Sequence, residues 1–174
     1  MRILLVMLLV AVATPSARAD EALRGRVLDL LSAYEEPASA ADWRALGEGA
    51  GAELYAVAQD TSLSHTRRAG AVYALGFFPT EAHRAYLAAL ATTDGADSLL
   101  RRKAVYALGA GWGDRAVPDL ARALAAPDSQ LRAATARALG KVGTPTAQEA
   151  LRARLATESD AMVRTTLTTV LGGR

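Results

Sequence analysis

A thirteen-residue segment recurs four times in this chain, and that recurrence limits the folds it can adopt. Residues 128–140 read DSQLRAATARALG, and related segments occupy 64–76, 97–109 and 160–172. Their Leu-Gly pairs follow one another at steps of 33, 31 and 32 residues. A sequence that repeats with a period in this range is typical of a solenoid or a repeat array, in which each unit packs on the next.

Each copy contains the signals that begin and end a helix. Asp97, Asp128 and Asp160, with Ser64 in the first copy, are residues that cap helix N-termini. The apolar residues that follow have helical spacing, and we expect the Gly of each Leu-Gly pair to end the helix. A second apolar run with steps of four follows each copy but the last, at Ala82-Tyr86-Leu90, Ala116-Leu120-Leu124 and Ala147-Leu151-Leu155. The unit is therefore predicted to be helix, short loop, helix.

The pattern D-x-x-[LV]-R-x-x-A-x-x-A-L-G, followed by A-x-x-x-L-x-x-x-L, resembles HEAT-type repeats. It is most similar to the short bacterial variety called PBS-lyase HEAT-like repeats, over residues 62–172. The resemblance implies an all-α fold, an α-solenoid of about four stacked antiparallel helix pairs with an N-terminal capping helix. The family includes bilin-attachment lyases and many scaffold proteins, so the resemblance alone does not choose a function.

The first residues have the pattern of a secretory signal peptide. Arg2 precedes an apolar run over 3–13, and Ala17-Arg18-Ala19 is a small-x-small cleavage signal. The alternative is a membrane anchor, but the run is shorter than the ~20 residues that a membrane span needs. We therefore predict a signal peptide at 1–19, a HEAT-like solenoid domain at 20–174, and export to the periplasm or the medium.

Between the leader and the clear repeats, the sequence predicts an atypical first unit. Residues 20–34 are expected to form an N-terminal helix that ends at Glu35-Glu36-Pro37. Residues 39–47 resemble a degenerate first helix, with 48–59 as its partner. At the other end, the Thr residues of 165–169 are expected to face away from the core.

The charge of the chain is unevenly distributed. Without Arg2 and Arg18, 18 basic and 18 acidic side chains remain. Residues 20–62 hold nine acidic side chains and three Arg, whereas 63–174 hold nine acidic and fifteen basic side chains. The balanced total disfavours nucleic-acid binding, and the asymmetry makes head-to-tail self-association possible.

No residue pattern points to catalysis, to a metal or to a cofactor. The chain has no Cys, and His65 and His83 have no second ligand at metal-like spacing. We expect both His to be solvated or to cap helices. The four recurring Arg are expected to pair with acids or carbonyls of the neighbouring repeat, rather than to form a ladder for a ligand.

Positions that differ between copies are the better candidates for partner binding. On the second helices, which line the concave side in HEAT-like proteins, these are Arg84, Asp119, Arg122, Glu149, Arg152 and Arg154. The loop aromatics Phe77, Phe78 and Trp112 are candidate anchors, with packing onto the core as the alternative. Tyr73 and Tyr106 share one place in successive copies and carry the same two alternatives.

These observations favour an exported, non-enzymatic scaffold that binds a protein partner. The alternative is a lyase-like enzyme or accessory subunit related to the bilin-attachment HEAT-repeat lyases.

Overall fold

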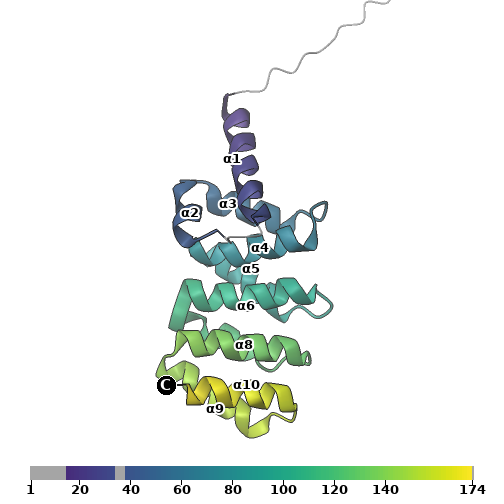
Figure 1. The fold of residues 1–174 in the computed structure, drawn as a ribbon, viewed down its shortest axis with the longest axis vertical. Coiled ribbons are helices and arrows are strands. Elements are labelled where there is room, and N and C mark those ends of the chain that lie inside the picture. The colour runs from purple at the N-terminus through teal and green to yellow at the C-terminus, as the bar shows by residue number, and fades with distance from the viewer. Residues whose placement is uncertain (1–14, 34–37, 174) are drawn as a thin grey trace, which may run out of the picture.

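The computed structural model describes residues 15–33 and 38–173, and this part of the chain is helical, with no strand. The helices stack along one axis (Figure 1). Their bounds are α1 (Pro15–Ser32), α2 (Ala40–Ala45), α3 (Ala50–Gln59), α4 (His65–Ala74), η1 (Leu75–Phe77), α5 (Glu81–Thr92), α6 (Ser98–Trp112), η2 (Gly113–Ala116), α7 (Val117–Ala123), α8 (Ser129–Val142), α9 (Pro145–Thr157) and α10 (Ala161–Gly172). The predicted all-α solenoid is confirmed. Residues 1–14 of the predicted signal peptide lie outside the described residues, and α1 begins before the predicted cleavage point.

Two rows of helices make up the stack. The first helices of the repeats, α4, α6, α8 and α10, each lie against the next, and α6, α8 and α10 form the near face in Figure 1. The second helices α5, α7 and α9 form the other row and pack against the first helices. A continuous core of Leu, Val and Ala runs between the rows, including Leu75, Leu108 and Leu139 at 0% exposure.

The first helices begin where the sequence predicted. Their N-caps accept hydrogen bonds from backbone N–H groups of the first turn: Ser64, Asp97, Asp128 and Asp160. These N–H groups have no partner inside the helix, so each cap satisfies donors that would otherwise need water.

The four recurring Arg join each first helix to the second helix before it. They are Arg68, Arg101, Arg132 and Arg164. Their guanidinium groups donate to carbonyls in the last turn of the preceding helix or just after it: those of Ala58, of Ala91, of Ala126 and Pro127, and of Leu155 and Glu158. The N···O distances are 2.7–3.2 Å. Such carbonyls lack an intrahelical partner, and a cation is favourable there. The prediction that these arginines pair with carbonyls or acids of the neighbouring repeat is confirmed.

The prediction that the Leu-Gly pairs end the helices holds in the first and last copies, where α4 gives way to η1 at Leu75 and α10 ends at Gly172, but it is wrong in the two middle copies. α6 and α8 continue through Gly109 and Gly140, and α8 ends only at Gly143, which adopts φ 70°. Three of the four glycines, Gly76, Gly109 and Gly140, lie where first helices approach one another. A Cβ on Gly76 would lie 2.9 Å from the carbonyl oxygen of Ala107, and one on Gly109 would lie 3.3 Å from that of Ala138.

The apolar stripe of α5 is one residue later than expected. His83, Leu87 and Ala91 are buried, whereas Ala82 is exposed. His83 lies eight residues after the preceding Leu of a Leu-Gly pair, as Ala116 and Ala147 do, and those two are buried as predicted. His83 is therefore part of the interior, so of the two alternatives expected for it, solvation or helix capping, solvation is wrong.

The N-terminal cap differs in part from the prediction. α1 stands upright at the end of the stack and packs on α3 and α4, with Val27 fully buried (Figure 1). Arg24 fastens it to α3 through Glu53 at 2.7 Å and to Asp60 at 2.5 Å. α2 contacts η1 and buries Trp43, while α3 packs mainly on α4 and α1. Residues 39–47 are therefore not the first-helix partner of 48–59.

The last first helix, α10, packs on α8 and α9. Val163 and Leu167 are fully buried, and Thr166, which was expected to face outward, is also buried. The other Thr residues of this helix are exposed as expected. No helix of the described residues is both long and apolar enough to cross a membrane.

Candidate functional site

The predicted charged residues of α5 and α7 form a cluster of ion pairs. Arg84 Nε lies 2.9 Å from Asp119 Oδ2, and Arg122 binds the second oxygen of the same carboxylate. Glu81 joins Arg84 at 3.6 Å and Arg115 at 2.7 Å. Asp119 has only 8% of its side chain exposed. The cluster thus holds α5 against α7. Because its charges largely neutralise one another, it has little net charge with which to attract a partner.

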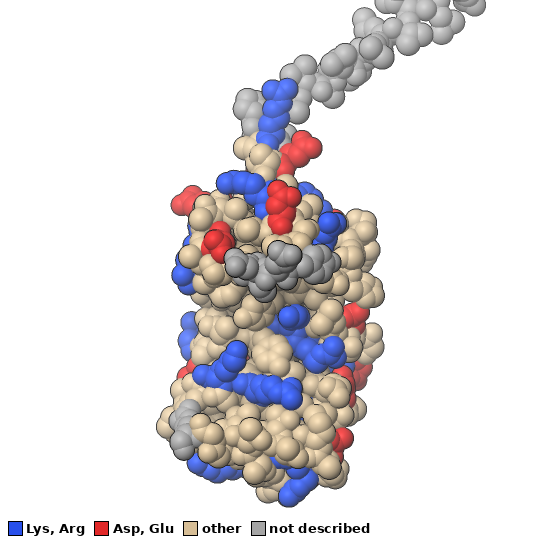
Figure 2. Space-filling model, viewed as in Figure 1, with Lys and Arg blue, Asp and Glu red and all other residues tan. Residues whose placement is uncertain are grey.

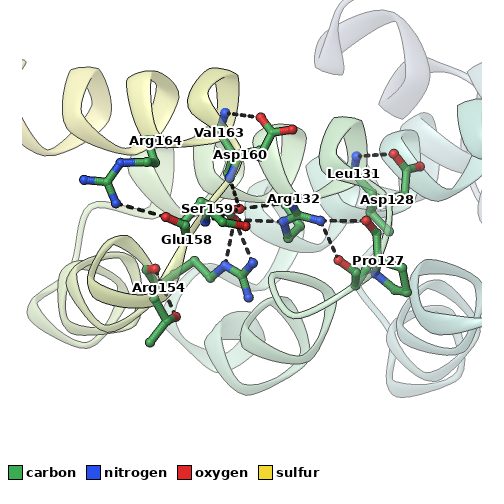
Figure 3. Close-up of polar contacts among 12 residues, drawn as sticks. Pro127, Asp128, Leu131, Arg132, Arg154, Glu158, Ser159, Asp160, Val163 and Arg164 are labelled. Carbon is green, nitrogen blue, oxygen red and sulfur yellow. Dashed lines mark hydrogen bonds and ion pairs between the residues drawn. The ribbon is translucent and has the colours of Figure 1, made fainter.

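A second cluster surrounds Glu158, which the sequence analysis did not single out (Figure 3). Its carboxylate is fully buried and accepts from Arg132 Nε at 2.8 Å and Nη2 at 2.9 Å, and from Arg154 Nε at 2.8 Å. The backbone N–H groups of Ser159 and Asp160 donate to the same carboxylate at 3.1 and 2.9 Å.

These donors, with Arg132 first among them, lower the pKa of Glu158 from 4.5 to about 2. Arg132 belongs to α8 and Glu158 to the loop between α9 and α10, so the cluster ties the last two repeats together. Arg154, a predicted partner-binding residue, is committed to this internal contact.

The other two predicted residues of α9, Glu149 and Arg152, are exposed. Arg152 donates to Gln148 at 3.0 Å within the same helix. The structure therefore does not bring the six predicted charged residues together as one site. Arg84, Asp119 and Arg122 pair with one another, and Arg154 pairs with Glu158. Glu149 and Arg152 remain as exposed side chains.

The loop aromatics fold onto the core, which is the second of the two alternatives considered. Trp112 is 7% exposed, and Phe77 and Phe78 are partly buried against the core. Phe77 also packs edge-on against Tyr73, with ring centroids 5.7 Å apart. Little of Trp112 is left for a partner, while Phe77 supports a tyrosine that is exposed.

That tyrosine lies at the edge of a hollow on the row of first helices, which we call the first-helix groove. Its volume is about 620 Å³. It is lined by Tyr73, Lys103, Tyr106, Gly109, Ala110, Arg137, Ala138 and Lys141. The small residues form its floor, because α6 and α8 approach closely where Gly109 faces Ala138. The larger side chains rise around this floor from α4, α6 and α8.

The groove is basic and aromatic. None of its lining residues is acidic, and its three cations form no ion pair with any described residue. Lys103 Nζ lies 5.4 Å from the centroid of the Tyr73 ring, so the ring orients this cation. Figure 2 shows basic side chains gathered over the middle of this face without acidic ones between them. The groove therefore attracts anionic groups and offers tyrosine rings for contact.

Part of this site was visible in the sequence. Tyr73 and Tyr106 were noted at one repeat position, two residues before the Leu of the Leu-Gly pair, and Arg137 stands at the same position in the third copy. Continuing that count would have found Arg137. Lys103 and Lys141 lie at other offsets, and only the stacking of the helices brings them to the same hollow.

The two histidines do not form a reactive centre. His83 Nδ1 is 2.7 Å from the carbonyl oxygen of Phe78, and its ring stacks on Tyr55. His65 is exposed and pairs with the capping residue Asp97 at 2.9 Å. Among the described residues, no group of three or more His, Asp or Glu side chains is arranged to hold a metal ion.

Comparison with known proteins supports the repeat assignment. The family model described as HEAT repeats matches residues 91–172. No curated protein is similar enough to match this sequence. Among solved structures, the chain is similar to one of the complex of CpcE and CpcF of phycocyanin lyase from Nostoc sp. PCC7120. The TM-score is 0.61 at 20% identity, over 88% of this chain and 98% of the other, which is a likeness of fold.

Proposed function

Because this chain is a HEAT-repeat protein with the fold of a phycocyanin-lyase component, we propose that it binds a partner protein through the first-helix groove. The observation that carries the proposal is the groove itself, where three cations without acidic partners surround two tyrosines. Tyr and Arg are the residues that most often dominate binding energy at protein interfaces. In this proposal the chain acts by binding and not by catalysis, and it acts outside the cytoplasm.

A pulldown with the chain from residue 20 onward, from the exported fraction of the native host, tests the proposal. A specific partner should be captured by the wild type and lost with Tyr106→Ala combined with Arg137→Ala. Arg152→Ala, an exposed arginine of α9 outside the groove, is the matched control and should retain the partner. Equal capture by all three proteins would show that the groove is not the binding surface.

The fold comparison favours a second candidate over a general scaffold, namely a lyase-like enzyme or accessory subunit. The observation behind it is that the similarity spans 98% of the compared chain, which belongs to a two-protein complex of a lyase. In that role this chain would pair with another protein and assist attachment of a bilin to an acceptor.

Incubation with a free bilin, with and without an acceptor protein, separates the two candidates. A visible absorbance change that depends on the chain would support the lyase-like role. An unchanged bilin spectrum, together with capture of a partner through the groove, would support the scaffold.

A further inference from the structure

We propose that the part of the partner that occupies the first-helix groove is an acidic, extended peptide segment. This inference rests on the proposed function and adds the chemistry of the bound segment. Its basis is the contrast between the one arginine that lines the groove, Arg137, and the arginines elsewhere in the stack.

Most arginines of the second helices and of the repeat junctions are already bound. Arg84 and Arg122 share the carboxylate of Asp119, and Arg132 and Arg154 share that of Glu158. Each of these pairs is satisfied inside the chain, so a partner would have to displace an existing carboxylate to use it. Arg137, by contrast, is exposed and makes no ion pair with a described residue. An unpaired guanidinium binds a carboxylate with two parallel hydrogen bonds, a geometry that few other groups match.

The cations of the groove lie on both sides of its floor. Arg137 and Lys141 are four residues apart on α8, so their side chains lie on the same face of that helix. Lys103 approaches from α6 and is held against the Tyr73 ring at 5.4 Å. Between them lie the small residues Gly109 and Ala138. A segment that crosses the groove would place carboxylates at both flanks and an apolar side chain over the floor, beside the tyrosine rings.

The size of the charged area favours a peptide over a nucleic acid. The groove offers three cations in about 620 Å³, whereas a nucleic-acid site neutralises roughly 6–10 phosphates along a track. The next first helix along the row, α10, exposes Thr165, Thr168 and Thr169, and the one basic residue beside them, Arg164, is bound to the carbonyls of Leu155 and Glu158. The basic area therefore ends where a nucleic-acid track would need to continue.

Binding of a fluorescein-labelled peptide of repeated Glu-Leu units, measured by anisotropy at low salt, tests the inference. A Gln-Leu peptide of the same length is the uncharged control and should bind far more weakly. Arg137→Glu with Lys141→Glu should weaken binding of the Glu-Leu peptide about tenfold or more, because two attractions become two repulsions. Arg115→Glu with Arg152→Glu makes the same change of charge outside the groove and should weaken binding less than about twofold. Raising the salt to physiological strength should weaken wild-type binding, since the Debye length there is about 8 Å.

Several results would overturn the inference. The first is equal loss in the two charge-reversed variants, which would mean a general charge effect. The second is binding of the Gln-Leu peptide as tight as that of the Glu-Leu peptide. The third is a single-stranded oligonucleotide that binds more tightly than the Glu-Leu peptide and is lost with the same variant. Circular dichroism checks folding, and Arg137→Gln with Lys141→Gln, which removes charge without reversing it, should give an intermediate loss.

The pulldown keeps this inference separate from the proposed function. If Tyr106→Ala alone abolishes capture of the partner but Arg137→Glu with Lys141→Glu does not, the groove binds a protein whose segment is not acidic. If the partner is indifferent to Tyr106 as well, the proposed function fails together with the inference.

Discussion

Replacement of Glu158 by Gln tests how the last two repeats are held together. The Gln side chain has nearly the same shape but no charge, and its amide N–H₂ would face the donors of Arg132 and Arg154. Arg132 is only 7% exposed, so its charge would remain buried without its main partner. Breaking one side of a buried ion pair costs about 3–5 kcal/mol. The pKa leads to a similar figure, because a fall from 4.5 to about 2 corresponds to roughly 3 kcal/mol.

We therefore expect Glu158→Gln to lower the free energy of unfolding by about 3 kcal/mol at neutral pH, measured by urea titration with far-UV circular dichroism. For a domain of this size that is a loss of roughly 6–12 °C in melting temperature. Glu149→Gln is the matched control, because it removes the same charge from an exposed position of α9. Its effect should stay within about 0.5 kcal/mol.

The stability difference between wild type and Glu158→Gln should also depend on pH, in a direction that the lowered pKa defines. The pKa of Glu158 is lowered in the folded chain, so its contribution is complete above the unfolded value of 4.5 and is lost as the pH falls toward about 2. Other carboxylates titrate in both proteins and cancel in the difference. The stability difference between wild type and Glu158→Gln should thus be constant above pH 4.5 and shrink below it. A variant as stable as wild type, or a difference that stays constant down to pH 2, would refute the role assigned to Glu158.

Four further outcomes are expected. Leu108→Ala should cost roughly 2–5 kcal/mol in a denaturant melt, since Leu108 is fully buried between repeats; a change within error would contradict the observed core. Gly76→Ala should destabilise by about 1–3 kcal/mol because its Cβ would meet the backbone of α6, whereas Gly25→Ala, with nothing within 4 Å, should be neutral or stabilising in thermal melts. Fractionation of the native host should find the chain outside the cytoplasm with its N-terminus at Asp20, and a cytoplasmic protein that keeps its first residues would refute export. Sedimentation should show a monomer at low and high salt, because Arg24 engages Glu53 and Asp60, two of the nine acidic side chains of residues 20–62, within the same chain; growth with concentration at low salt only would instead support head-to-tail self-association.

The candidate site was predictable only in part. The repeat position of Tyr73 and Tyr106 marked one side of the groove, since residues at one repeat position line up along a row of stacked helices. The charged residues chosen from the variable positions of the second helices were mostly committed to internal pairs instead. A sequence shows that a repeat position holds Arg in one copy and another residue in the next. It does not show whether a carboxylate elsewhere in the chain already forms an ion pair with that Arg.

The sequence by itself determined what depends on local interactions. The period, the N-caps at Ser64, Asp97, Asp128 and Asp160, and the recurring Arg all act within a helix or between neighbouring helices, so their spacing along the chain carries the information. The all-α solenoid follows from these signals because each amphipathic helix must bury one face against the next.

The tertiary structure alone decided how that spacing is used across the stack. The Gly of each Leu-Gly pair is a residue typical of a helix end. The structure shows a second role, because at Gly76 and Gly109 the missing side chain lets the backbone of a helix about thirty residues away approach closely. Glu158 lies two residues before the cap Asp160, where the other copies have Ser62, Gly95 and Ala126, and its role appears only when Arg132 and Arg154 reach it from two helices. The groove exists because close helix contact at Gly109 leaves a hollow between longer side chains. Distances between repeats set all of these features, and those distances depend on how the side chains of several helices pack together.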